Sequence, residues 1–339
     1  MKDNHIGIVG TGIYLPEERM TAAEIALATK GKWTAEAVIQ KLGIVEKTSP
    51  NGKDGTQEMG VRAAKDALKR NNVQPGEIDL ILCIGEEWKE YPLTTSGIYI
   101  QEQIGANNAW AIDLQQRCGT TVAAMKIAKD MMQNDEEINT VLIVGGYRNV
   151  DFIDYADTAV SFMYNLSAGG GAIILRKNLG KNILLGTHIV TDGSLARDVR
   201  VEFGGIANPI NTNNLDKAYL SLSVADEKHM KDRLNEVSMN NWMFCIDEAF
   251  RKSGLKRDEL GFLCGLHFKR SMFDYILKEL GLSHDQTIYL DHFGHIGQID
   301  QILTLHLALE QNKIQDGTII AMIAAGIGYA WGANVIQWG

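Results

Sequence analysis

Cys118 lies where a short apolar stretch meets a segment of helical composition. Residues 110–114 read Trp-Ala-Ile-Asp-Leu, and residues 118–125 read Cys-Gly-Thr-Thr-Val-Ala-Ala-Met. This pattern predicts a strand that passes through a polar corner into a helix, with the thiol at or near the helix N-terminus. Unpaired backbone N–H groups and the positive end of the helix dipole favour a thiolate there, and they stabilise an oxyanion formed beside it. Cys118 is therefore predicted to be a nucleophile.

The other three cysteines have the pattern of buried, inert thiols. Cys83 and Cys264 each lie inside an apolar stretch typical of a strand, and Cys245 lies in an amphipathic helical stretch. A buried cysteine usually behaves as a small hydrophobic side chain, and this is the alternative interpretation of Cys118 as well. The four cysteines show neither the spacing of a zinc site nor a disulfide framework, so the predicted compartment is the reducing cytoplasm.

Length and composition limit the classes of protein that fit. The chain has 339 residues, of which 45% are hydrophobic and 22% charged, and its formal net charge is −9. This length is enough for two domain-sized halves, each with a core of its own. The acidic balance argues against a nucleic-acid partner. Residues 1–5 lead directly into a predicted strand and lack the features of a signal peptide.

One uncharged stretch, residues 318–336, is as long as a membrane span. It contains Gly326, Gly328, Gly332 and Asn334. We interpret it as two buried strands around a Gly-Ile-Gly turn rather than as a transmembrane helix. Membrane insertion is therefore not predicted.

Two parts of the chain repeat the same order of predicted elements. Residues 67–80 hold the end of a helix, a polar loop and the start of an apolar strand, and residues 249–262 match them at an offset of 182. Residues 140–144 match residues 318–322 at an offset of 178. One loop insertion accounts for the change of offset. The repeat predicts two copies of an α/β module, with chance matches between apolar segments as the alternative.

The repeat also predicts which strand ends meet. The strand end that leads to Cys118 has its counterpart at residues 289–295, which contain His295, and His267 falls where Gly85 ends a strand of the first copy. Open α/β sheets bind ligands at such strand ends. Cysteine with histidine supplies a nucleophile and a base, and a second histidine can donate to an oxyanion. Cys118, His267 and His295 are therefore predicted to share one site.

A metal ion held by His292 and His295 is an alternative use of the same segment. No clustered carboxylate or thiol in the sequence completes a ligand set. No metal site is predicted.

Six segments spread over nearly the whole chain carry a family resemblance. They are residues 7–16, 41–44, 112–119, 266–268, 293–295 and 325–332. On these segments the chain resembles the thiolase-fold condensing enzymes, in particular β-ketoacyl-[acyl carrier protein] synthase III and its specialised relatives. The resemblance implies an α/β, thiolase-like fold with two duplicated α/β halves in a layered α-β-α-β-α arrangement. Residues 1–178 would form the half with the nucleophile and residues 179–339 the half with the two histidines.

The resemblance also implies roles for the site residues. Cys118 would accept an acyl group from a thioester of coenzyme A (CoA) or acyl carrier protein, while the backbone amides of Cys118 and Ile327 hold the oxyanion. His267 and His295 would bind the thioester carbonyl of a malonyl-type unit as its carboxylate leaves. These thioesters are substrates, and no permanently bound cofactor is implied. The family also implies a homodimer.

Two positions depart from the synthase III pattern. His295 stands where that enzyme has an asparagine, so activity would be lost on protonation if neutral His295 is required. Glu87 falls where hydroxymethylglutaryl-CoA synthase, another member of the fold, has a catalytic acid, which would suit condensation without decarboxylation. These departures favour a specialised condensing enzyme over the housekeeping initiation of fatty acids.

Four residues are candidates for binding CoA or the carrier protein. Lys41 resembles the basic residue that precedes Gly-Ile in the family, and Trp33 is near, but not in register with, the family's adenine-stacking tryptophan. Lys269 and Arg270 follow His267 in a locally basic region, which could dock CoA phosphates or an acidic carrier protein. Solvated surface charge is the alternative.

The leading hypothesis is an acyltransferase that forms a carbon–carbon bond by thioester Claisen condensation, in specialised lipid or secondary metabolism. The first alternative is non-decarboxylative condensation with Glu87, or acyl transfer to oxygen or nitrogen. The second alternative is a catalytically silent partner that binds a carrier protein.

Overall fold

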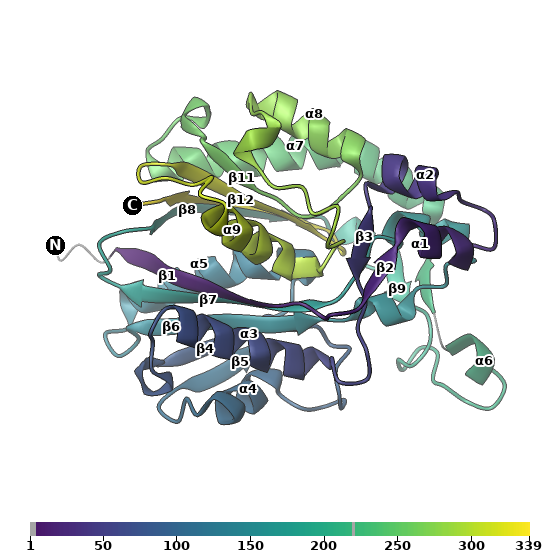
Figure 1. Cartoon of the computed structure of the whole chain (residues 1–339), viewed down its shortest axis with the longest axis horizontal. Coiled ribbons are helices and arrows are strands. Elements are labelled where there is room, and N and C mark those ends of the chain that lie inside the picture. Colours follow the sequence, from purple (N-terminus) through teal and green to yellow (C-terminus); the bar gives the residue numbers. More distant parts are fainter. Residues whose placement is uncertain (1–4, 219–220) are drawn as a thin grey trace.

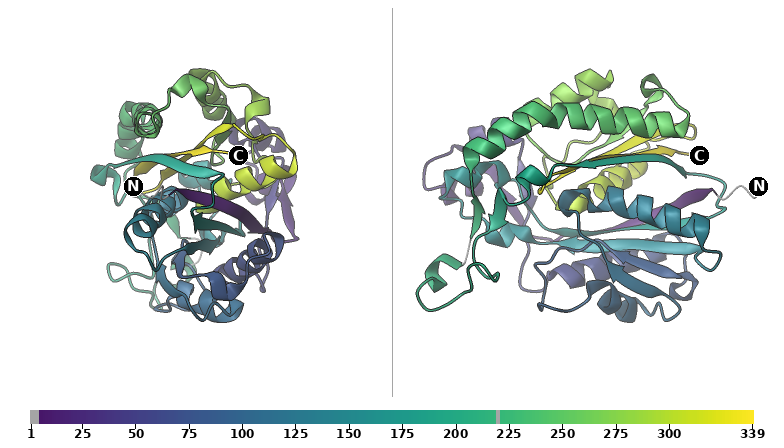
Figure 2. Two further views of the ribbon diagram at one scale, coloured as in Figure 1. Left: turned by 90° about the vertical axis from the view of Figure 1, so that its left-hand side faces the viewer. Right: turned by 180° about the vertical axis from the view of Figure 1, so that it is seen from behind.

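Helices and strands alternate in five layers. The structure is a computed structural model, and it describes residues 5–218 and 221–339. Two layers of strands are separated by one layer of helices and covered by helices on both outer faces, as Figure 1 shows. The views from the side and from behind show the N-terminal half on one side of the central helices and the C-terminal half on the other (Figure 2). The predicted layered α/β arrangement is confirmed.

The two strand layers belong to the two halves of the chain. In the first layer the strand order is β1-β7-β6-β4-β5, and in the second it is β8-β13-β12-β11. Only one residue pair, Gly7 with Ile183, joins β1 to β8. The bounds are β1 Ile6–Tyr14, β4 Leu80–Cys83, β5 Trp110–Asp113, β6 Thr140–Tyr147, β7 Gly169–Lys177, β8 Ile183–Thr191, β11 Phe262–Cys264, β12 Ile319–Gly326 and β13 Ala330–Gln337.

The internal repeat appears as equal strand directions in the two layers. β4 runs parallel to β6, which is antiparallel to β7. In the same way β11 runs parallel to β12, which is antiparallel to β13. The predicted division into residues 1–178 and 179–339 falls in the loop between β7 and β8, and it stays a prediction. Residues 318–336, interpreted as two strands, form β12 and β13 with a turn between them.

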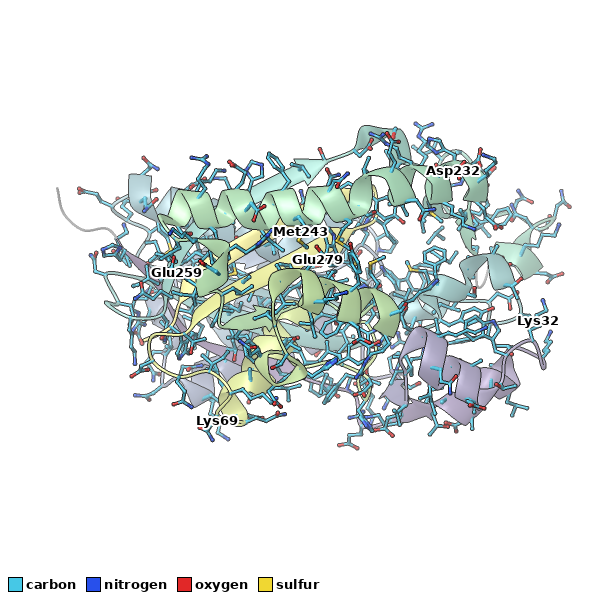
Figure 3. All side chains as sticks on the ribbon, turned by 90° about the horizontal axis from the view of Figure 1, so that it is seen from above. Lys32, Lys69, Asp232, Met243, Glu259 and Glu279 are labelled. Carbon is cyan, nitrogen blue, oxygen red and sulfur yellow. The ribbon has the colours of Figure 1, made fainter. Side chains whose placement is uncertain are left out.

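Six longer helices form the three helical layers. The central layer contains α5 (Thr120–Asn134) and α9 (Asp300–Glu310), which contact strands of both halves. The outer helices are α3 (Thr56–Arg70) and α4 (Ser96–Ile104) on the N-terminal half, and α7 (Glu227–Ser253) and α8 (Arg270–Leu280) on the C-terminal half. Figure 3 shows α7, which carries Met243, and α8, which carries Glu279, over the outer face of the C-terminal strands.

The position of α9 explains its composition. A helix packed on both sides by sheets has no solvated face, so it must be apolar nearly all round. Two of its buried polar side chains donate hydrogen bonds to backbone atoms: Gln301 Nε2 donates to the carbonyl of Cys118 at 3.2 Å, and Thr304 Oγ1 donates to the carbonyl of Asp300 at 2.8 Å. These polar groups connect the central layer to the strand ends.

The smaller elements lie at the end of the molecule where β4, β5 and β6 end, on the right in Figure 1. They are β2 Arg19–Thr21, β3 Glu46–Thr48, α1 Ala22–Ala28, α2 Ala35–Ala37, β9 Val199–Val201, α6 Leu215–Ala218 and β10 Leu222–Val224. Within the two described ranges of the chain, no helix has the length and apolar composition that a membrane crossing requires.

Candidate active site

The nucleophile corner, residues 114–119, connects β5 to α5. A short helical turn, Arg117–Gly119, precedes the first residue of α5. Cys118 lies in this turn and is 5% exposed. The thiol is therefore at the N-terminal side of a central helix, as the sequence predicts, where helix N–H groups and the dipole favour negative charge.

The backbone of this corner is held in an uncommon conformation. Arg117 has a φ of +52°, in the left-handed region that costs a non-glycine residue roughly 1–3 kcal/mol. Its guanidinium pairs with both Glu86 and Glu87 at 2.8 Å, and its carbonyl accepts a hydrogen bond from Thr120 Oγ1 at 2.6 Å. These contacts compensate the strain and fix the residue that precedes the thiol.

Cys118, His295 and Asp300 are connected by two successive side-chain contacts. Cys118 Sγ and His295 Nε2 are 3.2 Å apart, and His295 Nδ1 is 2.5 Å from Asp300 Oδ2. Asp300 is completely buried, and His295 is 5% exposed. The carboxylate accepts the Nδ1 proton, so it fixes the ring with Nε2 directed at the sulfur. This is the geometry of a nucleophile, a proton-carrying imidazole and an orienting acid.

The neighbouring charges keep His295 protonated. Burial works against the imidazolium, but the negative charges of Asp300 and Cys118 and their hydrogen bonds outweigh it and raise the pKa of His295 well above its usual value. The favoured form of His295 is therefore an imidazolium beside the Cys118 sulfur. Loss of activity on protonation, which is expected if neutral His295 is required, stays a prediction; Asp300, on the far side of the ring from Cys118, favours the charged form.

His267 lies in the same site but has different partners. Its Nε2 is 3.2 Å from the carbonyl oxygen of Gly43, which can only accept, so Nε2 carries the proton. Its Nδ1 accepts from Asn165 Nδ2 at 2.9 Å. Burial lowers the pKa of His267 to about 4. His267 is thus a neutral N–H donor at ordinary pH.

The two histidines are joined through Asp300. The backbone N–H of His267 donates to Asp300 Oδ2 at 2.7 Å, the same oxygen that His295 contacts. The structure therefore brings three of the four predicted catalytic residues together. Cys118 contacts His295 directly, and one shared carboxylate oxygen connects His295 to His267.

The end of β12 packs against the backbone of the nucleophile corner. A Cβ placed on Gly326 would be 3.2 Å from the backbone nitrogen of Cys118 and 2.6 Å from the carbonyl oxygen of Gln116. Glycine is required for this approach, because any side chain would push the two segments apart. Ile327 follows directly, which supports the prediction that its amide and that of Cys118 form one oxyanion hole.

Glu87 and its neighbour have different environments. The side chain of Glu87 is 67% exposed, and that of Glu86 is 2% exposed. Both carboxylates are engaged by the Arg117 guanidinium. The catalytic role of Glu87 stays a prediction, and the carboxylate that is buried beside the nucleophile corner is that of Glu86.

Three of the four predicted binding residues have aromatic partners near His267. Lys41 Nζ lies 5.9 Å from the Trp33 ring, and the guanidinium of Arg270 lies 4.6 Å from the Tyr289 ring. The Tyr289 ring is 5.0 Å from that of His267. Lys269 precedes α8, and this helix contacts the helical turn Val38–Leu42, which contains Lys41. Arg270 and Tyr289 thus lie beside His267, while Lys41 and Trp33 form a second pair of a cation and an aromatic ring; CoA binding would use such pairs.

Comparisons with known proteins place the chain in a family. The family model of 3-oxoacyl-[acyl-carrier-protein (ACP)] synthase III matches residues 112–193, and the model of its C-terminal part matches residues 250–338, so together they match half of the chain. The chain belongs to the 3-oxoacyl-[acyl-carrier-protein] synthase III family. The first match contains Cys118, and the second contains both His267 and His295.

Relatives and solved structures agree over the full length. The β-ketoacyl-[acyl-carrier-protein] synthase III of Wolbachia pipientis wMel is 23% identical over 334 residues, which cover 98% of each chain. The crystal structure of 3-oxoacyl-[acyl-carrier-protein] synthase III from Aquifex aeolicus VF5 is similar with a TM-score of 0.84 at 21% identity, covering 98% of this chain and 100% of that one. Xanthomonas campestris OleA with bound lauric acid and lauroyl-CoA is similar with a TM-score of 0.82 at 15% identity over 100% of both chains. At these identities the structural likeness shows the shared fold.

Sequence reasoning missed four residues of this synthase III-like site. Asp300, Asn165, Arg117 and Glu86 each act through a contact with a predicted residue or its backbone. One signal was available for Asp300, because it is an acidic residue at the start of a mostly apolar helical stretch, five positions after His295.

A further buried group, Tyr147, lies beside the site. The Tyr147 ring lies 6.2 Å from that of His295, and burial, together with the nearby charges of Cys118, Glu86 and Asp300, raises the pKa of its phenol well above the usual value. Over residues 5–218 and 221–339, no group of three or more His, Cys, Asp or Glu side chains has the geometry to hold a metal ion.

Proposed function

We propose that this synthase III family member is an acyltransferase that forms a carbon–carbon bond by decarboxylative thioester condensation, with the acyl group carried on Cys118. The observation that carries the proposal is the contact of Cys118 Sγ with His295 Nε2 at 3.2 Å, beside a neutral donor at His267. A thiolate beside an imidazolium suits the acyl transfer, and a neutral N–H donor suits the decarboxylation that follows.

In the first half-reaction the Cys118 thiolate attacks the carbonyl carbon of an acyl thioester. The carbonyl oxygen becomes an oxyanion, which the amides of Cys118 and Ile327 stabilise. Each well-placed donor contributes about 3 kcal/mol. When the tetrahedral intermediate collapses, the carbon–sulfur bond to the leaving thiolate breaks, and His295 Nε2 gives that thiolate its proton. The product is an acyl-enzyme with a neutral His295.

In the second half-reaction a malonyl-type thioester loses its carboxylate as carbon dioxide. The electron pair of the broken carbon–carbon bond forms an enolate. The enolate oxygen accepts a hydrogen bond from the Nε2 N–H of His267. The 3.2 Å contact of this nitrogen with the Gly43 carbonyl is long, so an incoming oxygen can replace it. The enolate carbon attacks the acyl carbon on Cys118. The carbon–sulfur bond then breaks, Cys118 leaves as a thiolate, and His295 takes up a proton from solvent.

Thioesters of CoA or of acyl carrier protein are the proposed substrates, and this chemistry uses no resident cofactor. Arg270, over the Tyr289 ring beside His267, and Lys41, near the Trp33 ring, support an anionic, nucleotide-like or carrier-bound donor. The acyl chain and its pathway belong to specialised lipid or secondary metabolism in this proposal. The four cysteines are free and buried, which fits a reducing cytoplasm.

We also propose that the protein is a homodimer paired through β5. This strand is at one end of the strand order, and its Trp110 and Ile112 side chains are 48% and 42% exposed. An exposed apolar edge strand invites pairing with a second chain, and a twofold axis would pair two copies of β5. Ile112→Lys is expected to give monomers by sedimentation velocity, and Ile206→Lys, at another exposed position, is the control. A monomeric wild type would refute the dimer.

The test of the reaction is mass spectrometry of the intact protein after incubation with a series of acyl-CoA and acyl-carrier thioesters. We expect an acyl adduct on the wild type and none on Cys118→Ala. Cys245→Ala, which removes a thiol in α7, is the matched control and should keep the adduct. If no thioester of either kind leaves an adduct on the wild type, the proposal is wrong.

A second function is favoured by the Cys118, His295 and Asp300 set. Once His295 has given its proton to the leaving thiolate, it can take a proton from an alcohol or amine that attacks the acyl-enzyme. The acyl group would then pass to oxygen or nitrogen, and Glu87 offers a further base for non-decarboxylative condensation. Release of one carbon dioxide from a malonyl donor for each acyl group that leaves Cys118 would exclude this second function.

A further inference from the structure

We propose that the Asp300 carboxylate is the positioning group for both half-reactions, because it holds the imidazole of one catalytic histidine and the backbone of the other. This inference rests on the proposed function. It assigns Asp300 a role that differs from those of the predicted site residues, because Asp300 would act through the two histidines and not by contact with the substrate.

The contacts of Asp300 divide between the two histidines and the segment between them. Oδ2 accepts from His295 Nδ1 at 2.5 Å and from the His267 backbone N–H at 2.7 Å, while Oδ1 accepts from the Ile296 backbone N–H at 2.7 Å. Asp300 is completely buried. The two 2.7 Å distances are typical of hydrogen bonds to a charged acceptor, and the contact with His295 is shorter still. The carboxylate is therefore satisfied by the site itself.

Asp300 joins segments that are not adjacent in the chain. His267 follows β11, and His295 lies in the loop before α9, whose first residue is Asp300. These segments touch only because they end at the same face of the fold. At the start of α9 the helix N-terminus also favours the negative charge. One ionised group thus sets the distance between two segments that are otherwise independent.

The first consequence concerns acylation. Asp300 accepts the Nδ1 proton of His295, so Nε2 faces Cys118 as a donor, and the imidazolium is retained beside the thiolate. An amide in place of the carboxylate removes this charge. The imidazole then loses its proton more readily, and the thiolate loses the cation that stabilises it.

The second consequence concerns the malonyl-type unit. The bond from the His267 backbone to Oδ2 fixes the start of the loop that carries the imidazole, while Asn165 and Gly43 fix its two ring nitrogens. Without the carboxylate, the peptide N–H at His267 has no buried acceptor. The donor for the enolate oxygen then moves relative to the acyl-enzyme, and decarboxylation slows as well.

Other charged or titratable groups also face His295. Cys118 comes from the nucleophile corner, Tyr147 from the end of β6, and His267 from the loop after β11. Glu86, beyond Tyr147, is paired with Arg117. Of these groups, Asp300 makes the only 2.5 Å contact with the ring, and it opposes Cys118 across it. The proton on His295 is therefore set by Asp300 first.

The test measures the two half-reactions separately in Asp300→Asn and His267→Ala. Alkylation of Cys118 by iodoacetamide between pH 5 and pH 9, followed by mass spectrometry, reports the thiolate. Carbon dioxide release from a malonyl thioester reports the second half-reaction. We expect Asp300→Asn to alkylate about tenfold or more slowly at pH 7, with its rate profile displaced to higher pH, and to lose carbon dioxide release. We expect His267→Ala to lose carbon dioxide release alone.

Asp54→Asn is the matched control, since Asp54 is 1% exposed and is paired with Arg62 and Tyr14 outside the site. It should keep the wild-type alkylation profile. An unchanged alkylation profile in Asp300→Asn, or loss of only one half-reaction, overturns the inference. If Asp300→Asn does not fold, proton NMR of the wild type decides: a strongly deshielded imidazole N–H that is absent in His295→Asn supports the inference, and its absence from the wild type overturns it.

These outcomes are separable from the proposed function. If the wild type forms no acyl adduct but its alkylation still depends on Asp300, the function is wrong and the positioning of the thiolate stands. If the adduct forms and Asp300→Asn alkylates normally, the function stands and the positioning role is wrong.

Discussion

Removal of the Arg117 side chain should destabilise the protein through the charge that it leaves behind. Arg117 pairs with Glu86, whose side chain is 2% exposed, and with Glu87, whose side chain is 67% exposed. In Arg117→Ala the Glu86 carboxylate stays buried without a cation. Breaking a fully buried pair costs about 3–5 kcal/mol, and because the Arg117 side chain is 37% exposed we expect a loss of about 2–3 kcal/mol in the free energy of unfolding.

Two different substitutions of Arg117 separate the effect of the lost charge on stability from the effect of backbone strain. Alanine keeps the φ of +52° unfavourable, whereas glycine adopts it freely, so Arg117→Gly should be about 1 kcal/mol less destabilising than Arg117→Ala. Glu87→Gln should cost under about 1 kcal/mol, because that pair is mostly solvated. Alkylation of Cys118 should slow in Arg117→Ala, since an uncompensated negative charge disfavours the thiolate.

Urea unfolding of a double-mutant cycle is the assay. In a Glu86→Gln background no buried carboxylate remains, so Arg117→Ala should cost under about 1 kcal/mol there. The difference between the two backgrounds is the coupling energy of the pair. Equal costs of Arg117→Ala in the two backgrounds would refute the reasoning, because the loss would then come from something other than the buried charge.

Three further predictions test other parts of the site. Gly326→Ala should slow acylation about 100-fold in a rapid-quench assay, because the added Cβ would displace the Cys118 amide from the oxyanion hole. The control is Gly193→Ala, where a Cβ meets no atom within 4 Å. Equal acylation rates in the two variants would contradict the packing argument. His267→Ala should still form the acyl adduct while condensation falls about 100-fold or more, and loss of the adduct would show that His267 serves acylation instead. Burial lowers the pKa of Lys47 to about 7 from 10.5 in the unfolded chain, so between these values the unfolded state binds more protons and wild-type stability should rise with pH by up to about 1.4 kcal/mol per pH unit. Lys47→Met should lack this rise in urea unfolding at pH 7.5 and pH 9, and parallel responses of the two proteins would contradict it.

The residues that could be predicted are those whose type and place in the chain carry a chemical meaning. Cys118 departs from the pattern of the other cysteines because it follows a strand and precedes a helix. His267 and His295 were found because an internal repeat places both at strand ends. The same repeat predicts two α/β modules with buried strands, and the family resemblance implies their layered arrangement.

The residues that were missed depend on contacts between distant segments. Asp300 acquires its role only where the ends of β11 and the loop before α9 meet. Glu86 and Glu87 are adjacent acidic residues just after β4, and their residue type does not show which of the two carboxylates is buried. The left-handed φ of Arg117 has no sequence signal, because arginine is not a residue that favours it.

Lys47 shows the same limit for a charged residue. Its position between Glu46 and Thr48 predicts an exposed side chain, yet it is 1% exposed. Its Nζ donates to the Tyr155 hydroxyl at 2.6 Å and to the Tyr164 carbonyl at 2.8 Å. Backbone carbonyls that accept from a side chain cannot be read from the sequence, so burial of this amine could not be predicted.

The most direct test of the account is a chase of the isolated acyl-enzyme. The protein is labelled with a radioactive acyl thioester, freed of excess reagent and mixed with an unlabelled malonyl thioester. The account predicts that the label leaves Cys118 and appears in a β-ketoacyl product, with one carbon dioxide released for each labelled group. A labelled Cys118 that does not react with the malonyl thioester, or that transfers its label without release of carbon dioxide, would contradict it.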